Sequence, residues 1–130
     1  VKVTGIQWSW KFEYPDYGVT STELHIPEGK QILLQMTSND VIHSFWVPQW
    51  RMKQDAVEGI TTHTTVTPTQ LGTFPVVCTE LCGLGHALMR SRAARTRPVY
   101  SLSTRRSRVR SRSMSLVRFS AAITASRRSG

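Results

Sequence analysis

Residues 6–14 read IQWSWKFEY, a stretch in which apolar and polar side chains alternate at every position. Ile6, Trp8, Trp10, Phe12 and Tyr14 share one face, and the polar residues between them share the other. A period of two is typical of a half-buried β-strand, because successive side chains of a strand point to opposite faces of its sheet. The pattern predicts one strand here, with its aromatic face in a core.

Five further segments are interpreted as short strands separated by turn-forming residues. They are residues 20–26, 31–37, 41–47, 60–67 and 73–78. The turns between them contain Pro-Asp-Tyr-Gly, Pro-Glu-Gly and Ser-Asn-Asp. No segment of ten residues has the 3.6-residue period of a helix. Short strands at regular spacing predict an all-β sandwich or barrel.

The charge of the chain is divided unevenly along its 130 residues. Residues 1–89 contain all eight acidic residues and five basic ones, which gives −3, whereas residues 90–130 contain twelve arginines and no acidic residue. A pI of about 10.6 would suggest a nucleic-acid-binding protein. The acidic character of the first 89 residues excludes that interpretation for the whole chain.

The two parts also differ in composition. Ser and Arg make up 22 of the last 41 residues, and such a segment buries too little apolar surface to offset the entropy lost on ordering. We therefore expect a domain over residues 1–89 and a disordered tail over residues 90–130. The sequence has no apolar run of the roughly 20 residues that a membrane span requires, and no signal peptide at its start.

Both cysteines lie in one short motif, Cys78-x3-Cys82-x3-His86-x2-Met89, directly after the last predicted strand. Two thiolates, an imidazole and a thioether are soft to borderline ligands, which suit copper better than calcium or magnesium. Three other interpretations remain open at this point. The cysteines could form a disulfide, bind structural zinc, or be buried thiols with Met89 in the core.

A site with two bridging thiolates and two metal ions needs a second imidazole from elsewhere in the chain. His25, His43 and His63 are the candidates. His43 differs from the other two in lying at the end of an apolar strand, beside Phe45 and Trp46.

At this point the sequence resembles a known family. The stretches HSFWVP (residues 43–48), MKQDA (52–56) and CTELCGLGHALM (78–89), together with QWSWKFEY (7–14), resemble subunit II of the haem-copper cytochrome c oxidases. The similarity covers residues 3–89 and points to the extramembrane domain with the binuclear copper centre called CuA. The resemblance implies a cupredoxin-like Greek-key β-barrel.

The resemblance also implies a set of metal ligands. Cys78 and Cys82 would bridge two copper ions, and His43 and His86 would each bind one of them. Met89 and the backbone carbonyl of Glu80 would be weak outer ligands. The Glu80 side chain would help to hold a magnesium or manganese ion at the interface with subunit I. Neighbouring apolar side chains would exclude water: Phe45, Trp46, Phe74 and Val76.

For function, the resemblance implies electron transfer from cytochrome c through the copper centre to the haem of subunit I. Trp8 would be the residue through which electrons enter, while Trp10 would pack in the core. Carboxylates could attract a basic cytochrome c, and the candidate contacts are Glu13, Asp16, Asp40 and Asp55. The whole oxidase would reduce oxygen and pump protons, and this domain alone would not be catalytic.

The family normally has two transmembrane helices ahead of this domain, and the chain starts after the point where they would end. The implied location is the outer, periplasmic face of the bacterial cytoplasmic membrane, or the intermembrane side in mitochondria. Glu58 replaces a proline of the family pattern. From Arg90 onward the sequence does not match, and a reading-frame change near residues 90–92 is our hypothesis. The barrel would then lack its last strand.

Three alternative functions remain at this stage. The same copper centre occurs in nitrous oxide reductase, although Trp8-x-Trp10 and residues 53–56 favour the oxidase. A copper chaperone or storage domain would bind exposed Cu(I). A nucleic-acid-binding protein with an arginine-rich arm would account for the tail alone, so no specific nucleic acid is expected as a partner.

Overall fold

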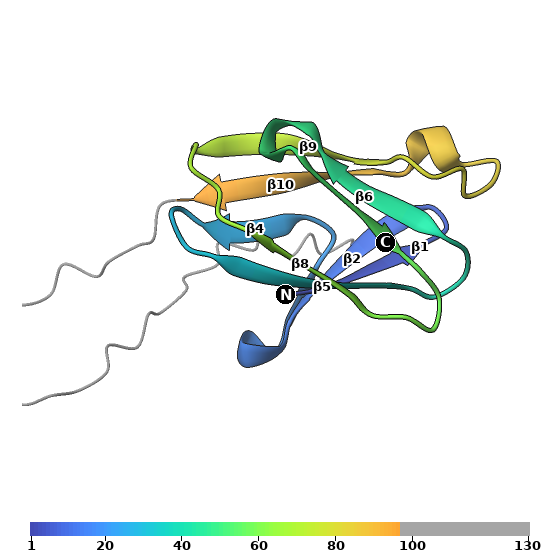
Figure 1. Ribbon diagram of the computed structural model, residues 1–130, viewed down its shortest axis with the longest axis horizontal. Helices are drawn as coiled ribbons and strands as arrows, with labels where there is room; N and C mark the ends of the chain where they lie inside the picture. Colours follow the sequence, from blue (N-terminus) through green and yellow to red (C-terminus); the bar gives the residue numbers. More distant parts are fainter. Residues whose placement is uncertain (97–130) are drawn as a thin grey trace, which may run out of the picture. The chain divides into compact units, whose positions relative to one another are not determined.

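The computed structural model describes residues 1–96, which form two five-stranded β-sheets around one core (Figure 1). The first sheet has the order β3 (Val19–Ser21), β2 (Ser9–Tyr14), β1 (Lys2–Ile6), β5 (Ile32–Ser38) and β8 (Thr62–Val66). The second has the order β4 (Leu24–Pro27), β10 (Arg90–Thr96), β9 (Gly72–Cys78), β6 (His43–Val47) and β7 (Met52–Ala56). The predicted all-β class is confirmed.

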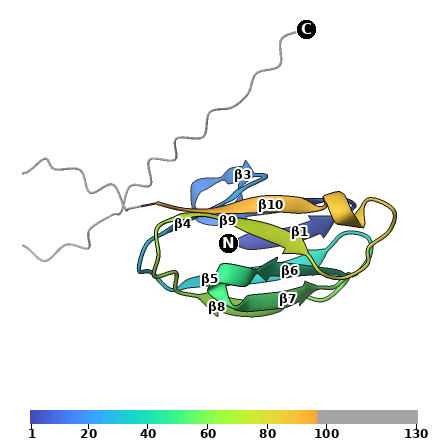
Figure 2. The ribbon, with the colours of Figure 1, turned by 90° about the horizontal axis from the view of Figure 1, so that it is seen from above.

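Most neighbouring strands are antiparallel, but β1 pairs with β5 and β10 pairs with β4 in parallel. Parallel neighbours require crossover connections, so the chain passes repeatedly between the two sheets. Figure 2 shows β9 and β10 on one side of the unit and β7 and β8 on the other. Three short 3-10 helices complete the described part: η1 (Pro15–Tyr17), η2 (Pro48–Trp50) and η3 (His86–Leu88).

Aromatic side chains from both sheets meet in the core. The ring of Phe45 on β6 makes edge-on contacts with Trp10 and Phe12 of β2, at centroid distances of 5.2 and 6.1 Å. Trp10 and Phe12 are buried, as the alternating pattern predicts. This cluster packs the two sheets together next to His43, the first residue of β6.

The prediction of a single strand over residues 6–14 is wrong. The chain reverses at Gln7 and Trp8, so that Ile6 at the end of β1 pairs with Ser9 at the start of β2. The alternation concealed this turn because Ile6 is apolar although its pairing with Ser9 puts it on the face opposite to Trp10 and Phe12. Trp8 therefore lies at a hairpin tip, outside the core face.

Other strand boundaries differ less. Residues 20–26 form two strands, β3 and β4, and β7 was not predicted because Met52–Ala56 has only two inward apolar side chains. The predicted strands over residues 31–37, 41–47, 60–67 and 73–78 correspond to β5, β6, β8 and β9.

The expectation that the barrel lacks its last strand is also wrong. Arg90–Thr96 form β10, which pairs with β9 on one side and β4 on the other. The domain boundary predicted at residue 89 is therefore too early. Composition misled the prediction, because this strand buries only Ala93 and Arg95, and the charge of Arg95 is paired with Glu28 at 2.6 Å. The rest of the predicted tail, residues 97–130, lies outside the described residues.

The seven residues of β10 change the charge of the folded unit. They add three arginines to a segment that otherwise carries −3, so the formal net charge of residues 1–96 is zero. Within residues 1–96, no helix has the length and apolar character needed to cross a membrane.

Candidate metal centre

The cysteine motif forms a compact loop between β9 and β10. Cys78 is the last residue of β9, and Met89 lies immediately before β10. Gly83 adopts a φ of 116°, a conformation that L side chains rarely adopt, and lets the chain turn back. The peptide N–H of Cys78 donates to the carbonyl of Met89 at 3.2 Å, which closes the loop at its base.

The loop gathers its sulfur and nitrogen atoms around the two cysteines. The Sγ atoms of Cys78 and Cys82 are 3.8 Å apart, and both thiols are free. Nδ1 of His86 lies 3.5 Å from the Cys82 sulfur, and Sδ of Met89 lies 3.7 Å from it. The carbonyl oxygen of Glu80 lies 3.3 Å from the sulfur of Cys78. The spacing of the two sulfurs exceeds a disulfide bond length of about 2.05 Å.

His43 completes the cluster from the neighbouring strand. It is fully buried at the start of β6, and its Nδ1 lies 3.9 Å from the sulfur of Cys78. One ligand atom from each of His43, Cys78 and Cys82 lies within 4.8 Å of the others. The strand pairing places it there, since Phe45 of β6 pairs with Cys78 of β9.

The two remaining histidines lie elsewhere. His25 is on β4, where its peptide N–H donates to the hydroxyl of Tyr14 at 2.6 Å. His63 is exposed on β8, with Nε2 3.4 Å from Nε2 of Gln35. Neither has a contact with the cysteine loop among the described residues, so His43 is the histidine that the fold brings to the cluster.

The donor set fits a soft or borderline metal. The two sulfurs lie in the middle, with His43 on the Cys78 side and His86 on the Cys82 side. Atoms 3.5–3.9 Å apart can share one metal ion when each bond is about 2.0–2.3 Å long, as zinc–imidazole and zinc–thiolate bonds are. The thioether of Met89 favours copper over zinc or a hard cation.

The thiol of Cys82 is held in its protonated form when no metal is bound. Burial, with the hydrogen bond and charge of Cys78 acting in the same direction, raises the pKa of Cys82 to about 11. A metal ion must displace this proton to bind, so metal binding and proton release are coupled.

Asp40 supports the ring of His43 from behind. Its Oδ1 lies 2.7 Å from Nε2 of His43, on the opposite side of the ring from Cys78. Burial acts to raise the pKa of Asp40, but hydrogen bonds from the Gln7 N–H, His43 and the Val41 N–H outweigh it and lower the pKa to about 2. The carboxylate stays ionised and can accept the Nε2 proton, which leaves Nδ1 of His43 free to bind a metal.

The hairpin tip of β1 and β2 lies over the loop. The indole Nε1 of Trp8 donates to the carbonyl of Cys82 at 3.2 Å, and the side-chain amide of Gln7 donates to the same oxygen at 2.7 Å. A Cβ on Gly85 would come within 2.2 Å of the Trp8 ring, so only glycine fits beneath the indole. Trp8 remains 42% exposed, whereas Trp10 is 1% exposed.

The apolar surroundings of His43 differ in part from the prediction. Trp10 lies edge-on to the His43 ring at a centroid distance of 6.0 Å, and Phe45 packs behind it. Trp46 instead faces outward, and Phe74 packs against Trp50 at a centroid distance of 5.9 Å. The alternation of β6 explains this, since Phe45 and Trp46 must point to opposite faces.

Sequence reasoning missed an apolar rim around the loop. Leu81, Leu84 and Leu88 are all at least 80% exposed, beside the half-exposed indole of Trp8. Exposed apolar side chains that gather in one place mark interaction sites. The signal was present in the sequence, because these three leucines lie inside the motif, next to its cysteine, glycine and methionine residues.

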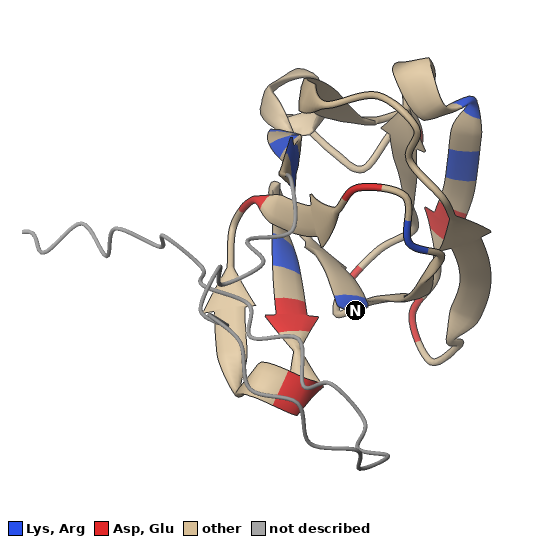
Figure 3. Cartoon of the chain, turned by 90° about the vertical axis from the view of Figure 1, so that its left-hand side faces the viewer, with Lys and Arg blue, Asp and Glu red and all other residues tan. Residues whose placement is uncertain are grey.

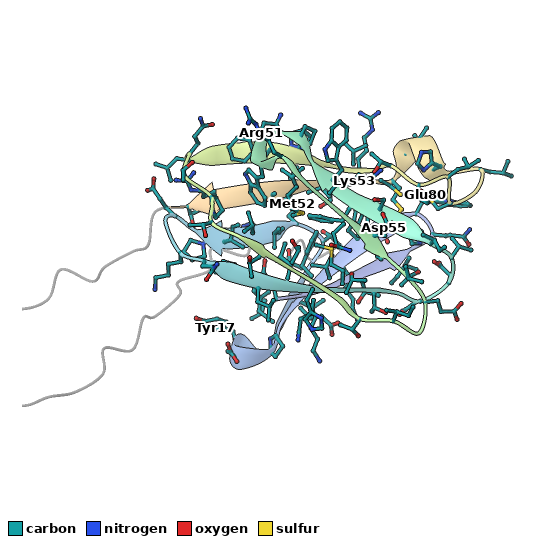
Figure 4. The ribbon with its side chains drawn as sticks, in the orientation of Figure 1. Tyr17, Arg51, Met52, Lys53, Asp55 and Glu80 are labelled. Carbon is teal, nitrogen blue, oxygen red and sulfur yellow. The ribbon has the colours of Figure 1, made fainter. Side chains whose placement is uncertain are left out.

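The candidate docking carboxylates are spread over the surface, and Figure 3 shows no single acidic patch in that view. Asp16 is next to Tyr17 in η1, on the opposite side of the unit from Glu80 (Figure 4), and Glu13 is paired with Lys11 at 3.2 Å. Asp55 lies on the same side as Glu80 and accepts a hydrogen bond from Ser44 at 2.6 Å. Docking roles for all four carboxylates stay predictions, and Asp40 has a structural role beside His43.

The sequence is similar to a family of respiratory proteins. The family model described as cytochrome c oxidase subunit II, periplasmic domain, matches residues 19–94. The chain is 56% identical over 91 residues to cytochrome c oxidase subunit 2 of Thermostichus vulcanus, and 45% identical over 91 residues to that of Synechocystis. These matches cover 70% of the chain but only 28% and 27% of the two relatives.

Solved structures agree with the sequence comparison. The periplasmic domain of subunit II of the Bradyrhizobium japonicum cytochrome oxidase superposes with a TM-score of 0.69 at 33% identity, covering 74% of this chain and 82% of that one. A second match, with a TM-score of 0.64 at 32% identity over 74% of this chain and 80% of that one, is a mixed disulfide between a thioredoxin-like protein and subunit II of cytochrome c oxidase. The cupredoxin-like fold is confirmed.

Proposed function

The chain belongs to the family of the periplasmic domain of cytochrome c oxidase subunit II, and from this premise we propose that it is an electron-transfer domain with a binuclear copper centre. The observation that carries the proposal is the arrangement of Cys78 and Cys82 between His43 and His86. Two central sulfurs with one imidazole at each end form a symmetric donor set for two metal ions.

Each ligand has a distinct role in this proposal. The thiolates of Cys78 and Cys82 would bridge the two ions, and His43 and His86 would bind one each through Nδ1. Met89 and the carbonyl of Glu80 would be the weak outer ligands. Copper in this setting supplies a one-electron redox couple. The protein would hold His43, Cys78 and His86 in place through β6, β9 and η3, so these parts of the site would rearrange little when its charge changes.

Trp8 is proposed as the residue through which electrons enter. Its indole is partly exposed, and its Nε1 is bonded to the carbonyl of Cys82, a bridging ligand. A donor that contacts the outer face of the indole is therefore one hydrogen bond and a few covalent bonds from the Cys82 sulfur. Trp10 is buried and packs against Phe45 and His43.

The electron donor is proposed to be cytochrome c or a related protein. Because the formal charge of residues 1–96 is zero, the attraction would depend on local charge near Trp8 rather than on the overall charge.

The exposed leucines of the loop, Leu81, Leu84 and Leu88, offer an apolar contact with a second partner. We propose that subunit I of the oxidase contacts these leucines and that the Glu80 side chain helps to hold a magnesium or manganese ion between the subunits.

The complete oxidase would carry out oxygen reduction, and this chain spans 28% of its Thermostichus relative. In the proposal the domain lies on the outer face of the bacterial cytoplasmic membrane as part of that complex. The domain alone passes electrons and forms no product.

The cysteine pair must be reduced before it can bind copper. Its sulfurs are 3.8 Å apart, close enough for a small movement to form a disulfide in an oxidising compartment. A relative forms a mixed disulfide with a thioredoxin-like protein. We infer that a reductant of this class keeps Cys78 and Cys82 reduced before the metal is inserted.

Stopped-flow mixing with reduced cytochrome c tests the transfer function. The copper-loaded chain is expected to oxidise the cytochrome in a fast second-order reaction that slows as salt rises, since salt screens local charge attraction. The metal-free chain is the control and should not react. A loaded chain that oxidises cytochrome c no faster than the metal-free chain would contradict the proposal.

A further inference from the structure

The Cys82–His86 half of the centre lies beyond the end of the sheet. Cys78 is fixed by the pairing of β9 with β6 and β10. For residues 80–88, most hydrogen bonds stay within the loop or run to residues that flank it, such as the bond from His86 N–H to the Gly83 carbonyl at 3.0 Å. Among the described residues, only Gln7 and Trp8 bond to this segment from another part of the fold.

Gln7 differs from Trp8 in reaching both halves of the centre. Its side-chain amide donates to the Cys82 carbonyl at 2.7 Å, a shorter bond than the 3.2 Å bond from the Trp8 indole. Its peptide N–H donates to Oδ2 of Asp40 at 2.7 Å, and the other oxygen of Asp40 holds His43 at 2.7 Å. One residue is thus linked to a histidine ligand on one side and a cysteine ligand on the other.

The surrounding glycines allow this close approach. A Cβ on Gly83 would lie 3.1 Å from Nε2 of Gln7, and a Cβ on Gly5 would lie 2.6 Å from Cδ2 of His43. Larger residues at these positions would push the hairpin away from the loop or from the His43 ring. The hairpin of β1 and β2 therefore packs closely against both ligand segments, and the absence of a side chain at Gly5 and Gly83 makes this packing possible.

We propose that Gln7 is a positioning residue of the copper centre, which holds the Cys82–His86 half in register with the Cys78–His43 half. This inference rests on the proposed function for its purpose, but the two hydrogen bonds exist without metal. Its two links act separately. A change of side chain removes the link to Cys82 and leaves the peptide link to Asp40 in place.

Gln7→Met separates the links, because methionine matches glutamine in length and cannot donate a hydrogen bond. In the metal-free full chain, we expect the carbonyl carbon resonance of Cys82 to shift. The amide protons of His86, Leu88 and Met89, which close the turns of the loop, are expected to exchange about fivefold faster, the effect of losing one ordinary hydrogen bond. The amides of β5 should be unchanged, which shows that the fold persists.

Gln31→Met is the matched control, since Gln31 is exposed before β5 and forms no side-chain hydrogen bond in the described part of the chain. It should leave the loop amides and the Cys82 resonance as in the wild type. If Gln7→Met gives the same result as Gln31→Met, Gln7 does not position the loop and the inference is overturned.

A second measurement connects the residue to the centre. In copper-loaded Gln7→Met, we expect the reduction potential to change and the electron spin to be shared less evenly between the two ions, because only the Cys82–His86 half has been loosened. An unchanged potential and spectrum would also overturn the inference. If the wild-type chain binds no copper pair, the proposed function fails, while the metal-free exchange data still decide the role of Gln7.

Discussion

Oδ1 of Asp40 lies 2.7 Å from Nε2 of His43, while Nδ1 of the same ring faces the sulfur of Cys78 at 3.9 Å. The imidazole is therefore held between a carboxylate and a thiol. Three further groups donate to this carboxylate: the peptide N–H groups of Gln7 and Val41, each at 2.7 Å, and the hydroxyl of Ser38 at 3.3 Å. Asp40 is three residues from His43 and holds its ring with Nδ1 directed at the Cys78 sulfur.

Replacing Asp40 should weaken metal binding. Asp40→Ala removes the partner of Nε2, and we expect the copper affinity to fall about 10–100-fold, the usual effect of losing a hydrogen bond behind a histidine ligand. Asp40→Asn keeps an acceptor oxygen and should have a smaller effect. Competition with a chelator of known affinity measures both. Asp16→Asn is the control on a distant exposed carboxylate, and equal affinity of Asp40→Ala and the wild type would contradict the assigned role.

Replacing Trp8 should affect transfer more than binding. Trp8→Phe keeps an aromatic ring above Gly85 but loses the Nε1 bond to the Cys82 carbonyl. We expect the chain to retain its copper content and to accept electrons from cytochrome c at least about tenfold more slowly, since the direct path to Cys82 is broken. Trp46→Phe changes another exposed indole, on β6, and should leave the rate unchanged. Equal electron-transfer rates for Trp8→Phe and Trp46→Phe would show that electrons do not enter through Trp8.

The buried charge in β10 gives a stability prediction. Nη2 of Arg95 donates to Oε1 of Glu28 at 2.6 Å, while Nε and Nη1 of the same side chain are buried without a hydrogen-bond partner within residues 1–96. Glu28→Ala should lower the free energy of unfolding by about 2 kcal/mol, because it leaves the buried guanidinium of Arg95 without its ion-pair partner. The decrease is limited because the side chain of Glu28 is itself partly exposed. Denaturant unfolding measures the change.

The double variant Glu28→Ala/Arg95→Leu should recover that loss. Leucine places no polar group in the core, so the desolvation cost of the guanidinium disappears together with the need for its partner. A double variant that is less stable than Glu28→Ala would show that the Arg95 side chain contributes packing that leucine cannot replace.

The role of β10 can be tested by shortening the chain. A chain that ends at Met89 loses the strand between β9 and β4 and exposes both of their edges. It should lack cooperative unfolding and bind copper poorly. A chain that ends at Thr96 keeps every described strand and should unfold cooperatively. Similar melting curves for the two would mean that β10 is dispensable.

The motif that supplies four of the proposed ligands was predictable because it is local. Cys78, Cys82, His86 and Met89 lie within twelve residues, and a loop of that length can bring their side chains together whatever surrounds it. His43 is 35 residues from Cys78, and the residues alone could not choose it over His25 and His63. The family resemblance made that choice, and the pairing of β6 with β9 explains it.

The hairpin at Gln7 and Trp8 and the strand β10 were not predictable from pattern. An unbroken alternation of polar and apolar residues conceals a two-residue reversal. A strand that is paired on both edges can be rich in Arg and Ser, since the backbone supplies its hydrogen bonds and only Ala93 and Arg95 enter the core. In both places the deciding contacts are between residues far apart in sequence, such as Gln7 with Cys82.

The central claim, a binuclear copper centre, is tested most directly by copper counting combined with electron paramagnetic resonance on the copper-loaded chain in its oxidised form. The expected result is two copper ions per chain and a hyperfine pattern from one electron shared between two equivalent nuclei. One copper ion per chain with the signal of an isolated ion would contradict the claim, because the paired sulfurs of Cys78 and Cys82 would then serve a single metal.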